Sequence, residues 1–357
     1  MAGVRDDIRV GLVGYGLGGA VFHAPLITTT PGLRLAAIVT ANADRHAAAA
    51  RDYPGATILP RVEALFDHAV AIDVVVIASP NRTHVPLALA ALGADISVVV
   101  DKPLAATAQE GRRVIDAARQ RKRLLTVFHN RRWDGDFLTV QRLLAEGALG
   151  EIHRFESRYE RWRPEPRRAW RENAAPEEAG GLLYDLGSHL IDQALTLFGP
   201  AATVYAELDR RRPQVAVDDD TFVAIGHSSG IRSHLWMSSV AAQIGPRIRV
   251  LGSRAAYTKY GLDVQEAALK GGARPGAAWG VEPRDSWGKI GPDDDLRAVA
   301  TEPGAYPVFY RRLEAAMRDG GPPPVAPEEA VAALEVIDAA RESASGKCTV
   351  ILPVQQR

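Results

Sequence analysis

The sequence predicts an N-terminal α/β domain with a doubly wound parallel sheet, followed by an α+β domain with a mainly antiparallel sheet. Short runs rich in Val and Ile recur through about the first 126 residues, and helical stretches separate them. Beyond them, strands with alternating apolar and polar residues follow one another with few helices between. We therefore expect one domain over residues 1–126 and a second over residues 127–357.

The strands expected in the first domain are apolar on consecutive positions, as in strands buried on both faces. They cover residues 8–13, 33–40, 74–78, 96–100 and 124–128. Helices are expected at 44–52, 61–68, 84–93 and 107–121. Strand, helix and strand in this order predict parallel strands joined by right-handed crossovers.

The second domain is expected to combine alternating strands with a few helices. A helix at 137–146 ends at Gly147 and Gly150, and a second helix spans 181–198. Strands are expected at 152–161, 202–208, 221–227, 231–238 and 247–251. The segment 271–295 is rich in Gly, Pro and Asp, which predicts a surface loop. A last helix at 327–343 leads to a strand at 348–352.

The composition excludes several classes of protein. The 43 basic and 43 acidic residues balance, which argues against a nucleic-acid partner. The single cysteine, Cys348, excludes an intrachain disulfide and a multi-cysteine zinc site. No apolar stretch reaches the roughly 18 residues of a membrane span. Asp6 and Asp7 precede the first apolar run, unlike the basic start of a secretory signal, so we expect a soluble, cytoplasmic protein.

A glycine-rich motif follows the first expected strand and opens a helix. In the pattern G-x-G-x-x-G, Gly14 permits a tight turn, Gly16 lets the backbone approach a pyrophosphate, and Gly19 packs the helix on the strand. The helix N-terminus then offers free N–H groups to phosphates. A glycine-rich turn without a ligand is the alternative. The candidate cofactor residues of this motif are Gly14, Tyr15, Gly16, Leu17, Gly18 and Gly19.

The end of the second strand lacks the acidic residue that binds the ribose of NAD. Thr40 and Asn42 stand there instead, and Asp44 is expected as the N-cap of the next helix. Thr40, Asn42 and Arg45 offer donors that suit a 2′-phosphate, which predicts NADP as the preferred cofactor, although NAD also fits. The alternative is that Arg45 is a solvated helix residue.

Polar residues follow the third and fourth expected strands. Lys102 comes directly after a buried strand, between Asp101 and Pro103. Because ligands bind at the carboxyl ends of parallel strands, we expect its ammonium to reach into the binding crevice. A surface lysine is the alternative. The candidate cofactor residues at these two strand ends are Ser79, Pro80, Asn81, His84, Asp101 and Lys102.

A third group of candidates lies in the helix expected after Gly180 and Gly181. Asp185, His189 and Asp192 are spaced i, i+4 and i+7, so they share one helix face. An aspartate and a histidine together suit proton-transfer chemistry. The same stripe also has metal-binding residue types, but without further clustered ligands we expect no metal site.

Taken together, these motifs resemble the Gfo/Idh/MocA oxidoreductase family over nearly the whole chain. The family's usual Glu-Lys-Pro triplet reads Asp101-Lys102-Pro103 here, which keeps the lysine. The segments 22–25, 129–134 and 184–189 resemble, more specifically, the NADP-dependent scyllo-inositol dehydrogenases. The resemblance implies a Rossmann domain, then a large open antiparallel sheet whose exposed face forms homodimers or homotetramers. It also implies that the last helix, 327–343, packs back near the first domain.

The activity implied by the resemblance is reversible oxidation of a secondary hydroxyl on a cyclitol or sugar, with hydride transfer to nicotinamide. In that reading Lys102, Asp185 and His189 are catalytic: His189 is the base, Lys102 stabilises the substrate oxygen, and Asp185 orients the substrate or the imidazole. The partner is a small polyol or sugar. The candidate substrate-binding residues are Asn130, Arg131, Trp133, Asp134, Arg163, Trp170, Asp185 and His189.

Two other functions remain open from the sequence. One is a ligand-binding regulator that has kept the fold without turnover; retention of Lys102, Asp185 and His189 favours the enzyme instead. The other is a glycosidase that uses a tightly held cofactor and produces no net change in it.

Overall fold

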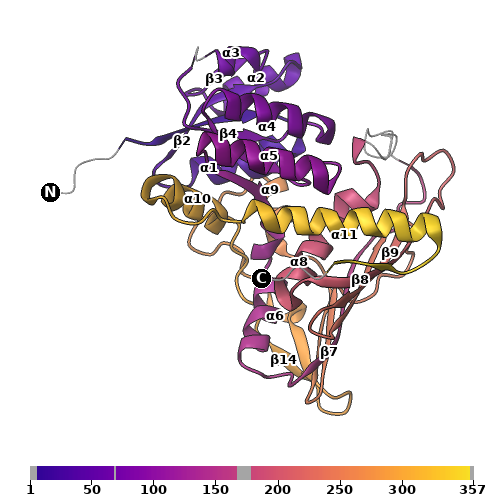
Figure 1. Cartoon of the computed structure of the whole chain (residues 1–357). Coiled ribbons are helices and arrows are strands. Elements are labelled where there is room, and N and C mark those ends of the chain that lie inside the picture. Colours follow the sequence, from indigo (N-terminus) through magenta and orange to yellow (C-terminus); the bar gives the residue numbers. More distant parts are fainter. Residues whose placement is uncertain (1–5, 68–69, 167–177, 354–357) are drawn as a thin grey trace.

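The computed structural model describes residues 6–67, 70–166 and 178–353, and two sheets dominate these ranges (Figure 1). A six-stranded sheet belongs to the N-terminal half, and a nine-stranded sheet belongs to the C-terminal half. Within the described ranges, no helix is both long and apolar enough to cross a membrane.

The N-terminal sheet is parallel throughout, with strand order β3-β2-β1-β4-β5-β6. Its strands are β1 (Ile8–Val13), β2 (Leu33–Val39), β3 (Thr57–Leu59), β4 (Val74–Ile77), β5 (Ser97–Asp101) and β6 (Leu125–Phe128). The order reverses between β1 and β4, which is where such a sheet binds its ligand. The prediction of a doubly wound Rossmann-type domain is confirmed, while β3 lies outside the predicted strands.

Helices cover both faces of this sheet. They are α1 (Ala24–Thr28), α2 (Ala43–Asp52), α3 (Glu63–Phe66), α4 (His84–Gly93) and α5 (Ala108–Arg121). Two irregular turns accompany them: a π-helical turn, η1 (Gly18–His23), and a 3-10 turn, η2 (Asn81–Thr83). Thr107 caps α5 by accepting a hydrogen bond from Glu110 N, and residues such as Val114 bury the apolar face of the helix.

The nine-stranded sheet has the order β14-β13-β12-β11-β7-β10-β9-β8-β15. Its pairings are antiparallel except between β10 and β7, so the predicted mainly antiparallel sheet is confirmed. Its strands are β7 (Ile152–Glu160), β8 (Ala201–Asp209), β9 (Asp220–His227), β10 (Arg232–Ser238), β11 (Ile248–Gly252), β12 (Ala256–Lys259), β13 (Gly288–Gly291), β14 (Arg297–Val299) and β15 (Val350–Ile351). Burial alternates along β9, as expected when one face is packed.

The C-terminal half also carries helices. They are η3 (Asn130–Trp133), α6 (Gly135–Ala145), η5 (Leu183–Gly187), α8 (Ser188–Phe198), α9 (Val264–Lys270), η6 (Arg284–Ser286), α10 (Pro307–Asp319) and α11 (Pro327–Gly346). The predicted loop at 271–295 is not wholly a loop, because it contains β13, which pairs with the preceding strand β12. A four-residue strand that begins and ends with glycine has no alternation long enough to be recognised.

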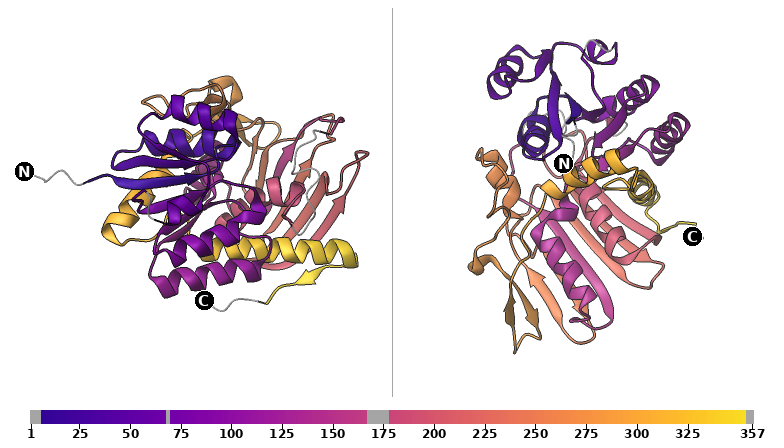
Figure 2. Two further views of the ribbon diagram at one scale, coloured as in Figure 1. Left: turned by 90° about the horizontal axis from the view of Figure 1, so that it is seen from above. Right: turned by 90° about the vertical axis from the view of Figure 1, so that its left-hand side faces the viewer.

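The long helix α11 contacts both halves of the molecule, as Figures 1 and 2 show. It packs against α5 of the N-terminal half, where Arg119 and Glu328 form a 2.8 Å ion pair. It also packs on β8, where Ser343 Oγ accepts a hydrogen bond from Ala206 N at 2.9 Å. This helix therefore helps to fix the two sheets relative to each other.

Candidate active site

The glycine-rich turn after β1 has the geometry of a dinucleotide-binding turn. Gly14 has a φ of +101°, and a Cβ added there would lie 2.6 Å from the carbonyl oxygen of Ala78. A Cβ on Gly19 would lie 1.9 Å from the carbonyl oxygen of Gly14, so only glycine allows this close packing. At Gly16, an added Cβ would meet only Arg45 Nη1, at 3.8 Å, which leaves the backbone open to a ligand.

Two side chains of this turn lie on different sides of it. Tyr15 is buried, and its hydroxyl donates to Asp52 Oδ2 at 3.2 Å while its ring edge meets Tyr53. Leu17 is 51% exposed. Of the two, Leu17 is the one whose side chain is free to cover a bound molecule.

The end of β2 places a cation beside the glycine-rich turn. Asn42, not Asp44, is the N-cap of α2: its side-chain oxygen accepts a hydrogen bond from Arg45 N at 2.9 Å. The expectation for Asp44 is therefore wrong, because the N-cap lies two residues earlier and Asp44 is in the first turn of the helix. Thr40 is buried at the strand end, and the guanidinium of Arg45 extends toward Gly16.

Polar residues after β4 bind mainly to the protein itself. Ser79 Oγ shares a 2.6 Å hydrogen bond with Thr83 Oγ1, and Pro80 precedes η2. Asn81 Nδ2 donates to the carbonyl oxygen of Ala179 at 2.9 Å, which links this loop to the C-terminal half. The buried ring of His84 contacts the carbonyl oxygens of Pro103 and Ser79, at 2.7 and 3.0 Å.

His84 therefore connects the loop after β4 to the loop after β5. Burial lowers the pKa of His84, so its imidazole is neutral near pH 7 and donates only one N–H bond at a time.

Asp101, the last residue of β5, accepts the N–H of Lys102 through Oδ1 at 2.8 Å. Burial alone would raise the pKa of Asp101, but His23, Lys102 and His84 nearby bring it down to about 2.

Lys102 meets Asp185 across the two halves of the molecule. Its Nζ lies 3.2 Å from Asp185 Oδ1 and also donates to the carbonyl oxygen of Asp185. Lys102 follows β5, whereas Asp185 belongs to η5, a π-helical turn of the kind often found at functional sites. Their side chains are 12% and 23% exposed, so this charged pair is accessible but largely shielded.

His189 lies in the first turn of α8, directly after η5. It is 6% exposed, and its Nδ1 has no hydrogen-bond partner among the described residues. Burial lowers the pKa of His189 well below the usual value, and the charges of Lys102 and Arg131 lower it further. The imidazole is therefore neutral at physiological pH, in the form that accepts a proton.

The third residue of the helix stripe, Asp192, has a different role. Arg132 forms a two-pronged ion pair with it, at 2.9 and 2.6 Å, and Arg132 also binds Glu329 of α11 at 2.7 Å. His129 Nδ1 lies 3.7 Å from the same carboxylate. Asp192 thus anchors η3 to α8, and its partner Arg132 connects both to α11.

The candidate substrate residues are spread over several environments. Arg131 is buried and donates to Tyr159 and Glu266, at 2.8 and 2.5 Å. Trp133 is buried against Phe309, and Asn130 is buried in η3. Arg163 is half-buried, and its N–H donates to the carbonyl oxygen of Ser239. Trp170 lies outside the described residues.

Asp134 forms part of a buried polar cluster beneath η3. Its carboxyl accepts from Tyr306 at 2.7 Å and from Arg131 at 3.3 Å. Burial raises the pKa of Asp134 to about 8, and the nearby carboxyls of Asp263 and Asp136 act in the same direction. Arg247, which the sequence analysis does not single out, joins this region through a 3.0 Å bond to Gln193 and lowers the pKa of His189.

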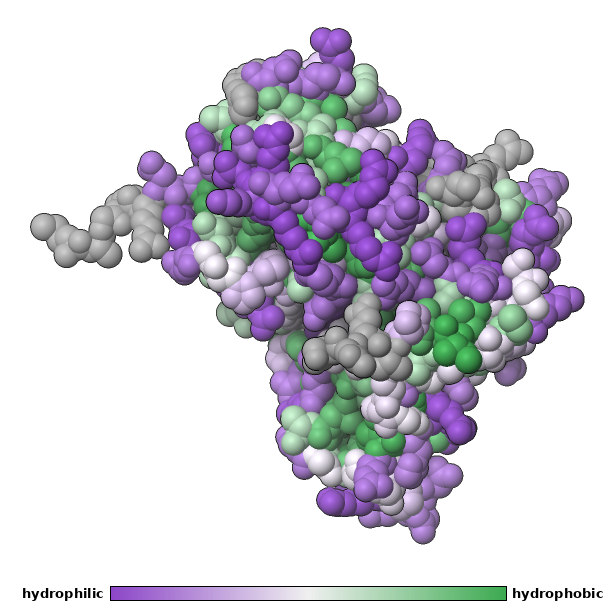
Figure 3. Space-filling model, in the orientation of Figure 1, coloured by the Kyte–Doolittle hydropathy of each residue, from purple (hydrophilic) through white to green (hydrophobic). Residues whose placement is uncertain are grey.

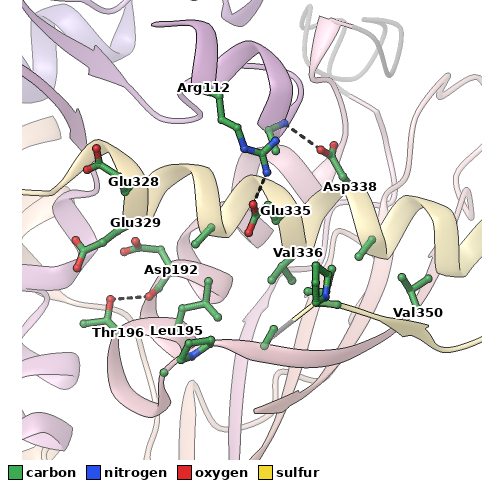
Figure 4. Close-up of a pocket in the computed structure, with 18 of the residues that line it drawn as sticks. Arg112, Asp192, Leu195, Thr196, Glu328, Glu329, Glu335, Val336, Asp338 and Val350 are labelled. Carbon is green, nitrogen blue, oxygen red and sulfur yellow. Dashed lines mark hydrogen bonds and ion pairs between the residues drawn. The ribbon is translucent and has the colours of Figure 1, made fainter. Parts of the chain in front are cut away.

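A separate groove of about 710 Å³ lies between α5, α8, α11 and β15 (Figure 4). Its wall combines apolar residues such as Leu195 and Val336 with carboxylates of α11. Ile351 on its edge is 80% exposed, and Figure 3 shows small apolar patches on this otherwise hydrophilic face. None of the predicted cofactor or catalytic residues lines this groove.

Comparison with known proteins identifies the family. Residues 8–129 match the NAD-binding Rossmann fold of the Gfo/Idh/MocA oxidoreductases, and residues 141–352 match the family's C-terminal alpha/beta domain. The chain belongs to the Gfo/Idh/MocA oxidoreductase family.

Two curated proteins align with this chain along nearly its whole length. The scyllo-inositol 2-dehydrogenase (NADP(+)) IolW of Bacillus subtilis is 36% identical over 352 residues, covering 97% of this chain and 96% of IolW. The uncharacterized oxidoreductase YdgJ of Escherichia coli is 43% identical over 354 residues, covering 98% of this chain and all of YdgJ. The predicted resemblance to scyllo-inositol dehydrogenases is confirmed.

Solved structures of other oxidoreductases agree with this fold. The oxidoreductase yvaA of Bacillus subtilis superposes with a TM-score of 0.90 at 34% identity, covering 98% of this chain and 100% of that chain. YPO2259 of Yersinia pestis also gives 0.90, at 39% identity, and covers 99% of both chains. The predicted NAD(P)-dependent oxidoreductase with a Rossmann domain is confirmed at the level of the family.

The residues at the Rossmann switch point fit the dinucleotide that the family implies. The open backbone at Gly16 leaves room for a pyrophosphate, and the guanidinium of Arg45 lies beside it. Leu17 is exposed over the turn. These residues would hold the dinucleotide, while Lys102 and Asp185 lie at the carboxyl end of β5.

Proposed function

We propose that the protein is an NADP(H)-preferring dehydrogenase that reversibly oxidises a secondary hydroxyl of a cyclitol or sugar. The observation that carries the proposal is the contact between Lys102 and Asp185, next to the buried, neutral His189. The similarity to IolW, whose name gives scyllo-inositol and NADP, supports the same class of substrate and the same cofactor.

The dinucleotide, when bound, supplies a nicotinamide ring that accepts a hydride. The chain's own residues must then stabilise the charge on the substrate oxygen and remove its proton. The ammonium of Lys102 stabilises the negative charge that develops on that oxygen, in a site that the protein largely shields from solvent. Asp185 holds the ammonium in place through its 3.2 Å contact.

His189 is the base that takes the hydroxyl proton. Its low pKa keeps the imidazole unprotonated at neutral pH, and the nearby cations disfavour retention of the proton. His189 therefore accepts a proton transiently and passes it on. In the reverse direction the same group donates the proton to the carbonyl oxygen.

The preference for NADP(H) rests on the end of β2. No carboxylate there repels a 2′-phosphate, and the guanidinium of Arg45 reaches the glycine-rich turn. Asn42 uses its side-chain oxygen as a helix cap, so its amide N–H groups remain as donors. Arg45 is thus the principal candidate for pairing with the phosphate.

The remaining assignments follow the family resemblance. We propose a cytoplasmic homo-oligomer that assembles through the outer face of the nine-stranded sheet. Half-buried aromatic residues occupy that face: Phe222 packs on Trp236 at 5.1 Å, and Arg158 stacks on Trp236 at 4.0 Å. Asn130, Arg131, Trp133, Asp134, Arg163 and Trp170 remain proposals as substrate contacts.

An initial-rate screen tests the proposed function. Inositols, aldoses and glucosides are each offered with NADP⁺ and with NAD⁺, and cofactor reduction is followed by absorbance. The proposal expects stoichiometric reduction with a cyclitol or free sugar. Glucoside cleavage without net reduction would indicate the glycosidase instead, and ligand binding without turnover would indicate a regulator.

A further inference from the structure

A buried chain of polar side chains lies behind the glycine-rich turn. The hydroxyl of Tyr310 in α10 hydrogen-bonds His23 Nδ1 at 2.6 Å, and His23 Nε2 lies 3.8 Å from Asp101 Oδ2. His23 is inaccessible to solvent, and Phe128 packs on its ring at 4.3 Å. Within the described ranges, Nε2 of His23 has no hydrogen-bond partner, so Asp101 is the charged group that it faces.

The chemistry of these groups determines which nitrogen of His23 carries the hydrogen. An ionised carboxylate only accepts, so the nitrogen facing Asp101 is stabilised when it carries the N–H. Nδ1 then accepts from Tyr310. Burial raises the pKa of Tyr310, and the charge of Asp101 adds to this, so the phenol keeps the proton that it donates. In this arrangement the hydroxyl hydrogen of Tyr310 faces His23, and the N–H of His23 faces Asp101.

Asp101 is held on its other side as well. Oδ1 accepts the N–H of Lys102, and Oδ2 lies 2.9 Å from the position that a Cβ on Gly18 would take. The carboxylate thus contacts the phosphate-binding turn, where a negative charge by itself opposes a bound pyrophosphate. The nearby positive charge of Lys102 offsets part of this repulsion.

We infer that His23 and Tyr310 are positioning residues that hold the Asp101 carboxylate at the glycine-rich turn, where its charge favours the oxidised cofactor over the reduced one. Asp101 ends β5, in the half of the sheet formed by β4, β5 and β6. The adenosine side of a doubly wound sheet belongs to β1 and β2, so the nicotinamide side belongs to this half.

The position of Asp101 affects cofactor binding because the charge of the nicotinamide ring depends on its oxidation state. The oxidised ring carries one positive charge and the reduced ring carries none. A fixed carboxylate on the same side of the sheet therefore stabilises only the oxidised form. The inference rests on the proposed dinucleotide site, but it is independent of the substrate's identity.

Cofactor titrations without substrate test it. The dissociation constants of NADP⁺ and NADPH are measured by calorimetry for the wild type and for Asp101→Asn. The ratio of the NADPH constant to the NADP⁺ constant should fall about tenfold, the effect of one partly shielded charge. Tyr310→Phe and His23→Phe should shift the ratio in the same direction. His23→Gln, whose amide N–H can replace Nε2–H, should keep most of the wild-type ratio.

A matched control separates positioning from general damage to packing. His227 is also a buried histidine, bonded to Gly199 and Ser233, but in the nine-stranded sheet, so His227→Phe should leave the ratio unchanged. An unchanged ratio in Asp101→Asn would overturn the inference. A wild-type ratio in folded Tyr310→Phe, which loses a single oxygen, would overturn the positioning role. Failure of the wild type to bind either form would instead reject the dinucleotide site itself.

Discussion

Lys102 and Asp185, 83 positions apart in the sequence, form an ion pair of 3.2 Å that bridges the Rossmann domain and the sheet domain. One residue follows a buried parallel strand, and the other lies in a π-helical turn before α8. This contact brings an ammonium, a carboxylate and the neutral His189 into one region of the molecule. The proposed hydride-transfer chemistry depends on that arrangement.

Replacing Lys102 should abolish most turnover without unfolding the protein. Lys102→Met removes the charge that stabilises the substrate oxygen, and we expect kcat to fall about 10²–10³-fold. Steady-state kinetics and a thermal melt measure the two effects. Lys289→Met, at an exposed position of β13, is the control and should retain activity. A fully active Lys102→Met variant would remove this residue from the site.

His189→Ala should lower kcat by about 10²–10⁴-fold, the usual contribution of a positioned base. Cofactor affinity should change little, because His189 is assigned to the substrate. The pH–rate profile should also lose its dependence on the low pKa of this imidazole. His153→Ala, on the exposed side of β7, serves as the control. Near-normal turnover with an unchanged profile would contradict the assignment.

Arg45→Ala should reduce the preference for NADP(H) over NAD(H). A charge-assisted bond to a 2′-phosphate contributes about 1.5–3 kcal/mol, which is about ten- to a hundredfold in affinity. The measurement is kcat/KM with both cofactors. Arg51→Ala, at the other end of α2, should leave the ratio unchanged. A wild-type preference for NAD(H), or no effect of Arg45→Ala, would refute this role of Arg45.

The catalytic candidates could be recognised from the sequence because their placement follows from simple geometry. A residue directly after a buried parallel strand lies at the binding edge, which places Lys102. Helical spacing likewise relates Asp185 to His189, although the π-helical turn between them was not predictable from spacing alone. The two-sheet architecture follows from the change between continuous and alternating apolar patterns.

Contacts between distant segments could not be predicted in this way. Asn81 donates to Ala179, and His84 binds Pro103, although each was expected only as a cofactor residue. Nothing in the local sequence marks such partners, because they depend on how the two halves pack. The short strands β3, β12, β13 and β14 and the helices α9 and α10 also lie outside the predicted elements. Three- or four-residue strands are too short to show a period.

The buried histidines should lower the free energy of unfolding as the pH drops from about 6.5 toward 5, the range set by the ordinary histidine pKa. Burial lowers the pKa of His84, His129 and His189 in the folded protein, so the unfolded chain binds more protons there. Each histidine then costs up to about 1.4 kcal/mol per pH unit. Asp134, Asp218 and Asp263 act in the opposite direction, because their raised pKa values make the folded state bind the extra protons.

Comparison with a variant isolates the histidine contribution, since these aspartates are common to both proteins. Urea unfolding at pH 5, 6 and 7 should show a shallower dependence of the unfolding free energy on pH for His84→Gln than for the wild type. The exposed His153→Gln should retain the wild-type dependence. Equal slopes for all three proteins would show that His84 is not held neutral in the fold.

Transfer of deuterium from substrate to cofactor tests the central claim most directly. Scyllo-inositol deuterated at its ring carbons is incubated with NADP⁺ and the protein, and the cofactor is then analysed by mass spectrometry. If the proposed function is right, the carbon–deuterium bond would break, deuteride would pass to the nicotinamide, and the hydroxyl proton would go to His189. We expect NADPH one mass unit heavier than normal with the wild type, and a much lower yield with Lys102→Met. Reduced cofactor without deuterium, or no reduction with any polyol offered, would contradict the assignment of this protein as a cyclitol or sugar dehydrogenase.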